Sequence, residues 1–485
     1  MRLALQHNNA NRSSPHQNVR QKCQTKMSGN EEGKNIDLDT LREDRRSGSL
    51  ALRKQKRGDL IQLKRVRVAV PSDNTSSDNT SQTVSGNLDL EKMPEVVDSL
   101  IKFKVETRLA TLTRLSNMLA QGCEAVETFL SVDKAMAGLM RALSLPETQL
   151  QACWCVTNIA AGTSAHTKHA MEAAPYLILF LATNNQYLQE QSAWALGNMA
   201  GDGVVCRDLL IAHGVVVPLV RLLQNDCAAV VHYSAYALTN ILRGINADVS
   251  VALHAGVVAT AVSALKQFSS NQRVRVELLW LFVWLNVNSL EVPTLLAQHH
   301  HFLPLLFDIF NETSSTDIDA IEHVSPILRL LGQLVCDDAT ADNIVNDDKT
   351  MLTLHSLTTS TTLHIQLECA WVVSNIAGGH VQCADTLIKF GFIPTILQNL
   401  KKITVLQKEA MITLLGISNH DAEHITMCVP LSTLQEILGL LNVPDLELQH
   451  LILQFLELWC RLIPEGAAAV ERQGGVRLLE SQQFH

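Results

Sequence analysis

Tryptophan and asparagine recur four residues apart in this chain, a pairing whose chemistry suits a basic peptide. The three clearest copies are WCVTNIAAG from Trp154, WALGNMAG from Trp194 and WVVSNIAG from Trp371. Because a helix turns about 100° per residue, this spacing places the indole and the carboxamide on one face. The apolar positions of the first copy fall on the opposite face: Ala152, Val156 and Ile159. The pattern therefore predicts that the Trp and Asn side chains point away from the packing stripe.

Such an array could bind lysine and arginine. Indole faces attract a cation and accept its aliphatic stem, at about 0.5 to 2 kcal/mol per contact. Each carboxamide offers a donor and an acceptor to a peptide backbone, with a net gain of about 0.5 to 1.5 kcal/mol per hydrogen bond. Because each contact is weak, affinity has to come from several copies. We expect binding of an extended basic peptide that weakens with salt.

The helices that carry these residues repeat with a regular period. Equivalent positions are 40, 42, 44, 49, 42 and 41 residues apart: Asn158, Asn198, Asn240, Trp284, Gln333, Asn375 and Gly416. A period of about 40 to 47 residues is typical of armadillo or HEAT repeats, whose helices bury their apolar faces against neighbouring repeats. Glycines follow the Asn-bearing helix, where a left-handed C-cap is expected: Gly162, Gly201, Gly244 and Gly378. Prolines open the next apolar run, as expected of a first helical turn: Pro175, Pro218, Pro304 and Pro394.

Composition agrees with an all-α chain. The 485 residues are 47% hydrophobic and 5% aromatic, without strand-like alternation. No run approaches the roughly 18 apolar residues of a membrane span, and we expect no signal peptide at the N-terminus. Eleven cysteines lie mostly inside apolar helices, which favours reduced thiols in a cytosolic or nuclear protein.

Charge is distributed unevenly. Residues 1–67 hold 16 Lys and Arg against 7 Asp and Glu, leaving 23 of the 39 basic and 41 of the 48 acidic residues for the remainder. An acidic body repels nucleic acid and attracts basic ligands. The basic segment alone could bind nucleic acid, a membrane, an acidic protein or the body of its own chain.

The change in charge along the chain also predicts the domain boundaries. Residues 1–40 are polar and aperiodic, and we expect them to be disordered. Residues 41–68, the arm, alternate leucines with basic residues, a mix that suits a helix ordering on an acidic partner. Residues 69–93 form a polar linker, and the repeats run over 94–485.

At this level of detail the chain resembles the importin-α family, the armadillo adaptors of nuclear import. The segment LRKQKRGDLIQLKRVRV resembles the importin-β-binding segment, and NIAAGTSAHTK and WALGNMAGDG resemble the second and third repeats. The resemblance implies an armadillo-repeat, right-handed superhelical solenoid with a flexible basic N-terminal arm. The chain length and the repeats that depart from the family pattern point to a divergent branch of the family. The customary name of this branch refers to transmembrane and coiled-coil domains, although this sequence has neither a membrane span nor a sustained heptad.

The resemblance implies a major peptide-binding site with a lysine pocket. In the family, a carbonyl, a threonine and an aspartate hold the key lysine of a nuclear localisation signal, and Gly162, Thr167 and Asp202 match them. The flanking positions also match, with Tyr236 where the family has Trp: Trp154, Asn158, Gln191, Trp194, Asn198, Tyr236 and Asn240. We expect this site to be intact or slightly weakened.

The implied minor site is incomplete. Five positions match: Glu277, Trp280, Arg329, Trp371 and Asn375. Ile412 and Gly416 stand where the family has Trp and Asn, which puts bipartite signals in doubt as cargo.

The arm departs from the family as well. The expected importin-β-binding residues are Arg53, Lys54, Lys56, Arg57, Lys64 and Arg65. Lys64, Arg65, Val66 and Arg67 replace the Lys-Arg-Arg cluster that mimics a signal in the family. We therefore expect looser self-inhibition.

Each feature has an alternative explanation. Trp and Asn at helical spacing could be core and cap residues, Asp202 a solvated loop acid, and the arm a disordered tail. His166 with His169, and the run His299 to His301, resemble metal ligands but more often lie on a surface, and no metal or cofactor is predicted. Catalytic motifs are missing: the sequence contains no phosphate loop, nucleophile elbow or HExxH, so we do not predict an enzyme.

We expect a nuclear import adaptor of the cytoplasm and nucleus, whose acidic groove captures basic signals of cargo while the arm recruits importin-β. Neither direct nucleic-acid binding nor membrane insertion is predicted. The alternative is an armadillo scaffold that retains the fold but binds a non-cargo peptide or helix without import activity.

Overall fold

The structure is a computed structural model that describes residues 64–65, 90–244, 246–312, 320–335 and 338–481. The chain divides into two compact units, residues 50–309 (the N-terminal unit) and residues 310–485 grouped with 1–49 (the C-terminal unit). Each unit is described by itself. Within the described residues every regular element is helical, which confirms the all-α expectation. The predicted arm, except Lys64 and Arg65, lies outside the described residues.

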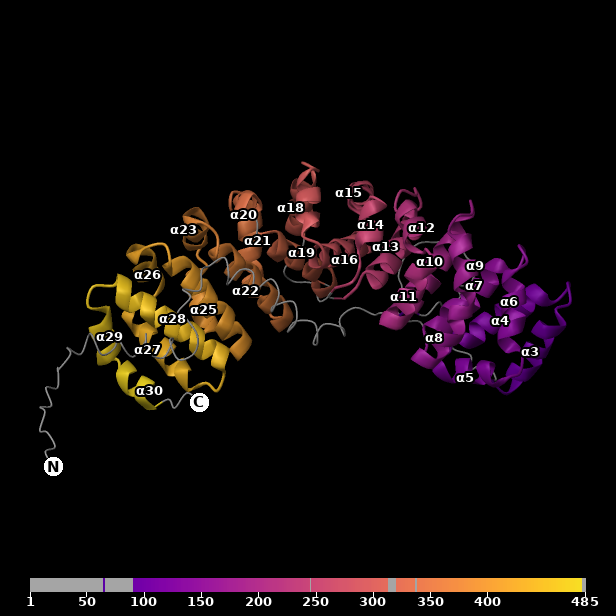
Figure 1. The fold of residues 1–485 in the computed structure, drawn as a ribbon, viewed down its shortest axis with the longest axis horizontal. Coiled ribbons are helices and arrows are strands. Elements are labelled where there is room, and N and C mark those ends of the chain that lie inside the picture. Colours follow the sequence, from indigo (N-terminus) through magenta and orange to yellow (C-terminus); the bar gives the residue numbers. More distant parts are fainter. Residues whose placement is uncertain (1–63, 66–89, 245, 313–319, 336–337, 482–485) are drawn as a thin grey trace, which may run out of the picture. The chain divides into compact units, whose positions relative to one another are not determined.

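The N-terminal unit repeats a motif of three helices. Its third helices pack on one another in chain order: α4 (Arg108–Leu119), α7 (Gln149–Ala160), α10 (Gln186–Gly201), α13 (Ala228–Ile241) and α16 (Gln272–Asn288). The other helices occupy the remaining layers (Figure 1): η2 (Leu90–Lys92), α3 (Met93–Lys102), α5 (Cys123–Ser131), α6 (Ala135–Leu143), α8 (Ser164–Ala170), η3 (Met171–Ala173), α9 (Ala174–Phe180), α11 (Val204–Ala212), α12 (Val216–Leu222), α14 (Ser250–His254), α15 (Val257–Gln267), α17 (Glu291–Ala297) and α18 (Phe302–Asn311).

The C-terminal unit repeats the same motif. Its third helices again pack in chain order: α19 (Ala320–Leu334), α22 (Leu363–Ala377), α25 (Thr404–Ser418) and α28 (Leu446–Leu462). The remaining helices are α20 (Asp338–Val345), α21 (Asp348–Thr358), α23 (Val381–Lys389), α24 (Ile393–Asn399), α26 (Ala422–Cys428), α27 (Leu431–Gly439), η4 (Leu440–Asn442), α29 (Gly466–Arg472) and α30 (Gly475–Ser481).

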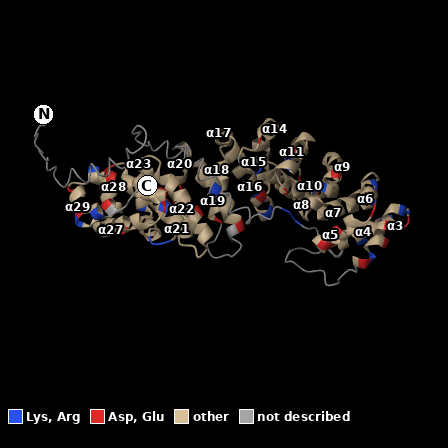
Figure 2. Cartoon of the chain, turned by 60° about the horizontal axis from the view of Figure 1, so that its bottom comes forward, with Lys and Arg blue, Asp and Glu red and all other residues tan. Residues whose placement is uncertain are grey.

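The third helices are buried on nearly every side. In α7 the residues from Cys155 to Ala160 are all buried, and the helix contains no charged residue, so it is tan throughout in Figure 2. Neighbouring third helices cover two sides and the second helix of the repeat covers another. Asn158 is 3% exposed and donates from Nδ2 to the Ser116 carbonyl at 3.1 Å.

Asparagine side chains link consecutive repeats at four positions, including Asn158. Asn198 donates to the Thr157 carbonyl at 3.1 Å, Asn240 to that of Gly197 at 3.0 Å and Asn375 to that of Gly332 at 2.8 Å. Each bond joins one third helix to the preceding one. The Thr157 and Ser116 carbonyls also accept from the backbone amides of Ala161 and Ala120. The asparagines therefore add bonds between neighbouring helices, a structural role in addition to any role in binding.

The proline positions are confirmed but the glycine caps are largely wrong. Each of the four prolines lies within the first three positions of its helix. Of the four glycines predicted as left-handed caps only Gly244 has a positive φ, at 120°. Gly378 caps α22 at φ −76°, whereas Asp202 follows Gly201 as the cap of α10. Gly162 is required for space, because a Cβ there would lie 2.3 Å from the Nδ1 atom of His166.

A histidine in the C-terminal unit joins two repeats through carboxylates on both ring nitrogens. His424 Nδ1 lies 2.8 Å from Asp421 Oδ1, and its Nε2 lies 2.9 Å from Asp385 Oδ1. Burial lowers the pKa of His424, but the bonds to Asp421 and Asp385 outweigh it and raise the pKa above 6.5. A histidine whose pKa is higher in the folded than in the unfolded state stabilises the fold at pH values below its unfolded-state pKa. This stabilisation is lost as the pH rises through the folded-state pKa.

We therefore predict that His424→Gln lowers the free energy of unfolding more at pH 5.5 than at pH 8.5, by about 1 kcal/mol, because both carboxylates are partly exposed. Denaturant titrations at the two pH values measure this. His300→Gln, at an exposed position, is the control. An equal loss at both pH values for His424→Gln would show that the protonated ring does not stabilise the fold.

Candidate peptide-binding surface

The chain's own Lys64 lies in a pocket of three oxygen acceptors at the ends of α7, α8 and α10. Its Nζ lies 3.0 Å from the Gly162 carbonyl, 2.7 Å from Thr167 Oγ1 and 2.6 Å from Asp202 Oδ1. An ammonium has three donors and no acceptor, so the pocket satisfies it completely. The structure thus brings together the three residues matched to the family's lysine pocket.

Local structure positions each acceptor. Gly162 is followed by a capping box in which the Thr163 amide donates to His166 Nδ1 at 3.2 Å and the His166 amide approaches Thr163 Oγ1 at 3.4 Å. Thr167 is buried in α8 and bonds its own helix through Thr163. The cap thereby orients the Gly162 carbonyl and the Thr167 hydroxyl toward the same ammonium.

The Asp202 carboxylate is held from both sides. Its Oδ2 accepts from Ser164 Oγ at 2.7 Å while its Oδ1 accepts from Lys64. Burial raises the pKa of Asp202, but the hydrogen bonds from Lys64 and Ser164 outweigh it and leave the pKa below its usual value of 3.8. The pocket therefore presents an ionised acceptor at neutral pH.

The backbone of Arg65 pairs with α10. The Arg65 amide donates to Asn198 Oδ1 at 2.8 Å, and its carbonyl accepts from Asn198 Nδ2 at 2.8 Å and from Trp194 Nε1 at 3.0 Å. One carboxamide thus satisfies both polar groups of a single peptide residue. Asn198 is fully buried because the peptide backbone covers it.

The Arg65 side chain extends toward α13 and α16. Its guanidinium forms an ion pair with Glu277, lies 3.1 Å from His232 Nε2, and stacks with Cζ 4.2 Å from the Tyr236 ring centroid. Tyr236 also donates to Asn198 Oδ1 at 2.9 Å. We call the surface formed by Gly162, Thr167, Asp202, Trp194, Asn198, His232, Tyr236 and Glu277 the ladder surface.

Two residues make contacts that differ from the sequence expectation. Glu277 was grouped with the minor site, but it contacts Arg65 beside the residues of the major site. Gln191 was expected to contact peptide, yet its Nε2 donates to Thr157 Oγ1 within the fold at 2.5 Å. Asn240 donates to the Gly197 carbonyl, a bond like the one Asn198 makes to Thr157 alongside its contacts with Arg65, so its role in peptide binding stays a prediction. Trp154 is half-buried on α7.

Sequence reasoning missed Tyr233 and His232. The Tyr233 ring stacks on the Trp194 indole with centroids 4.3 Å apart and planes at 12°, so it covers one indole face. His232 and Tyr233 precede Tyr236 by four and three residues, which is the helical spacing of a shared face. This spacing in the sequence could have identified both residues as part of the surface.

The residues expected in the minor site are divided between the two units. Glu277 and Trp280 lie on α16 of the N-terminal unit, whereas Arg329, Trp371 and Asn375 lie on α19 and α22 of the C-terminal unit. Arg329 Nε donates to the fully buried Glu368 at 3.2 Å. The Trp371 ring packs where a side chain at position 332 would project, which requires Gly332.

Close helix packing explains the missing Asn at position 416. A Cβ on Gly416 would lie 2.5 Å from the Ala377 carbonyl oxygen, so α25 approaches the end of α22 too closely for any side chain. We predict that Gly416→Ala lowers the free energy of unfolding by about 1 to 3 kcal/mol.

Gly439 is the matched control for this substitution, because it ends α27 with no atom within 4 Å of its Cβ direction. Gly439→Ala should stabilise the chain by about 0.4 to 1 kcal/mol. Denaturant unfolding of both variants checks the pair. Equal effects of the two substitutions would contradict the packing explanation.

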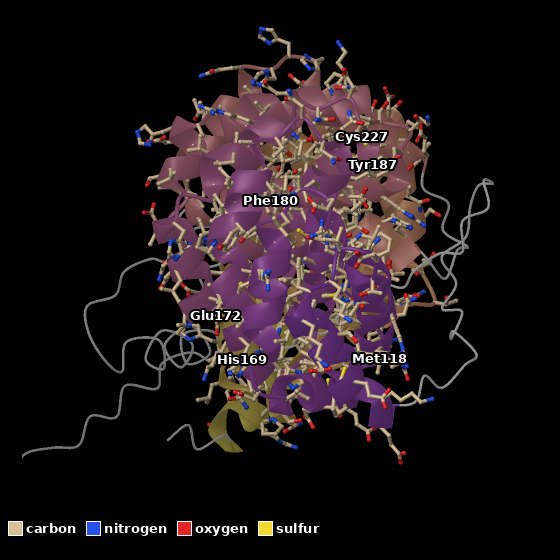
Figure 3. The ribbon with its side chains drawn as sticks, turned by 90° about the vertical axis from the view of Figure 1, so that its right-hand side faces the viewer. Met118, His169, Glu172, Phe180, Tyr187 and Cys227 are labelled. Carbon is tan, nitrogen blue, oxygen red and sulfur yellow. The ribbon has the colours of Figure 1, made fainter. Side chains whose placement is uncertain are left out.

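Histidine and cysteine show no sign of a metal site in the described part of the chain. No cluster of three or more potential ligands occurs there. His166 was expected on the surface but is 3% exposed and serves as a cap. His169 is exposed, and Figure 3 places it toward the same edge as Glu172. The nine described cysteines are free, and burial raises the pKa of Cys153 and Cys428 to about 12.

Of the predicted importin-β-binding residues, Arg53, Lys54, Lys56 and Arg57 lie outside the described residues. The other two, Lys64 and Arg65, occupy the ladder surface. Among the described helices no single one has the length and apolar composition to cross a membrane; the bent pair Ala422–Cys428 and Leu431–Asn442 meets that test by length and composition alone.

Comparison with known proteins gives two domain matches. Residues 32–113 match the model of the importin beta binding domain, and residues 204–243 match the armadillo/beta-catenin-like repeat. Importin subunit alpha-9 of Arabidopsis thaliana is 28% identical over 82% of this chain and 80% of the relative. Importin subunit alpha-2 of Oryza sativa subsp. japonica is 26% identical over 91% of this chain and 89% of the relative. The crystal structure of an engineered protein is similar in fold, with a TM-score of 0.71 at 22% identity over 81% of this chain and 95% of that one.

The fold and the ladder surface define an all-α armadillo protein with a surface that holds Lys64 and Arg65 of its own chain. The importin beta binding match and the two relatives show that this chain is similar to importin α subunits over most of its length.

Proposed function

We propose that this protein is a nuclear import adaptor that shuttles between cytoplasm and nucleus, binding basic signals of cargo on the ladder surface and importin-β through its arm. One observation carries the binding proposal: the Lys64 ammonium is met by three acceptors while Asn198 pairs with the next backbone. A basic segment of another protein offers the same groups in the same order. The armadillo and importin-α families are non-enzymatic transport or scaffold proteins, so we propose no catalysis.

The arm links the two partners. Residues 41–68 lie within the match to the importin beta binding domain. Because Lys64 and Arg65 occupy the ladder surface, importin-β and the surface compete for the same residues. Binding of importin-β to the arm then favours cargo binding, and cargo favours importin-β by the same factor.

The C-terminal unit contributes less to cargo binding in this proposal. Its third helices retain Trp371 and Asn375, but Ile412 and Gly416 offer neither ring nor amide. Signals with a single basic cluster are therefore the proposed cargo. This loss, together with 26 to 28% identity to the importin α relatives, supports a divergent branch of the family.

Reconstituted import into permeabilised cells tests the function. A fluorescent cargo with a single basic cluster should accumulate in nuclei only when this protein and importin-β are both added. In parallel, a fusion of residues 41–68 should retain purified importin-β. Peptide binding without import or importin-β binding would instead support the scaffold alternative.

A further inference from the structure

The subsite beside the lysine pocket matches an arginine more closely than a lysine. Two different nitrogens of the Arg65 guanidinium contact two acceptors, Nη2 meeting Glu277 and Nη1 lying 3.1 Å from His232 Nε2. The Tyr236 ring lies under the guanidinium plane at 4.2 Å. An ammonium has one nitrogen and no plane, so it cannot reproduce two separated bonds and the stacking at once.

His232 acts as an acceptor only in its neutral form. Its Nδ1 lies 3.1 Å from the Arg273 carbonyl, which can only accept, so the ring proton belongs on Nδ1. Nε2 is then left with a lone pair toward Arg65. A second proton would occupy Nε2, remove this acceptor and set two cations against each other.

The groups around His232 favour the neutral ring. Burial lowers the pKa of His232 below 6.5, and Arg65 and the Arg273 side chain act in the same direction. Glu277 and the bond to the Arg273 carbonyl oppose this shift without cancelling it. From its own helix, Tyr233 packs edge-on against the imidazole with ring centroids 4.7 Å apart. The ring is therefore neutral at physiological pH when the arginine is bound.

We propose that His232, Tyr236 and Glu277 form an arginine-selective subsite, so that the ladder surface prefers Lys-Arg to Lys-Lys in its ligand as long as His232 is neutral. The inference rests on the proposed function and narrows it to a class of basic signal. His232 and Tyr236 act as specificity-determining residues, whereas the pocket of Gly162, Thr167 and Asp202 binds the lysine common to both ligands.

Peptide titration on the full chain tests the proposal. Lys64→Ala and Arg65→Ala are introduced together so that the arm does not fill the surface. The probes are a fluorescein-labelled peptide GDLIQLKRVRVAV, residues 58–70 of this chain, and the same peptide with Arg65→Lys. Polarisation at pH 8 should give a Kd roughly tenfold lower for the arginine peptide, from one charge-assisted bond and the stacking. At pH 5.5 the ratio should be lower than at pH 8, because protonation of His232 opposes binding of the arginine.

Two substitutions separate the role of His232 from general damage. His232→Gln keeps an acceptor that cannot be protonated, so the preference should persist at both pH values. His232→Leu removes the acceptor and should bring the ratio close to that measured for the parent at pH 5.5. Equal Kd values for the two peptides at pH 8 would overturn the selectivity alone. Absence of binding by both peptides would overturn the proposed function as well.

Discussion

Replacing Asp202 by lysine should abolish binding of basic peptides to the ladder surface. Asp202 is the charged acceptor of the lysine pocket and lies 2.6 Å from the Lys64 ammonium, with its side chain 9% exposed. Truncating one partner of a buried, hydrogen-bonded charge pair costs about 2 to 5 kcal/mol, which corresponds to a Kd raised roughly 30-fold to several thousand-fold. Charge reversal adds repulsion. Fluorescence polarisation with a basic peptide, on the chain carrying Lys64→Ala and Arg65→Ala, measures the change.

The control for this prediction is Asp208→Lys. Asp208 lies on α11 at an exposed position and changes the net charge by the same amount. The Kd of this variant for the basic peptide should stay within about twofold of the parent value, since an exposed charge acts only through screened electrostatics. If both reversals weakened binding equally, the effect would come from overall charge and the pocket would have no specific role.

Removing the two arm residues should have the second large effect. Lys64→Ala with Arg65→Ala deletes the contacts to Asp202, Glu277 and the Tyr236 ring. A tethered segment meets its surface at an effective concentration of about millimolar, so an intrinsic Kd of tens of micromolar raises the apparent Kd of a competitor roughly 10- to 100-fold. The double variant should therefore bind an external basic peptide about 10- to 100-fold more tightly than the unmodified chain.

Lys102→Ala with Lys104→Ala removes the same two charges from exposed positions at α3 and the turn after it. That variant should bind the peptide as weakly as the unmodified chain. An unchanged Kd for the arm variant would mean that the arm does not compete for the surface in solution.

The repeat fold was predictable because it is encoded locally. The period of about 40 residues and the prolines of the first helical turns are visible in the sequence. The lysine pocket was found because Gly162, Thr167 and Asp202 follow two copies of one phrase and match a family pattern. Such features depend on short segments whose geometry repeats.

Contacts between repeats were less predictable. Glu277 was assigned to another site because its distance from Asn198 in space depends on how α10, α13 and α16 pack, which no local pattern records. The sequence did not indicate that neighbouring atoms leave no room for a Cβ at Gly162 or Gly416. The structural bonds of Asn158 and Gln191 likewise depend on neighbouring helices.

A crystal structure of the Lys64→Ala, Arg65→Ala chain with the peptide GDLIQLKRVRVAV would test the central claim most directly. We predict that the peptide lysine contacts the Gly162 carbonyl, Thr167 and Asp202, and that Asn198 pairs with the backbone of the following arginine. A peptide bound elsewhere, or a ladder surface left empty at saturating peptide, would contradict the account.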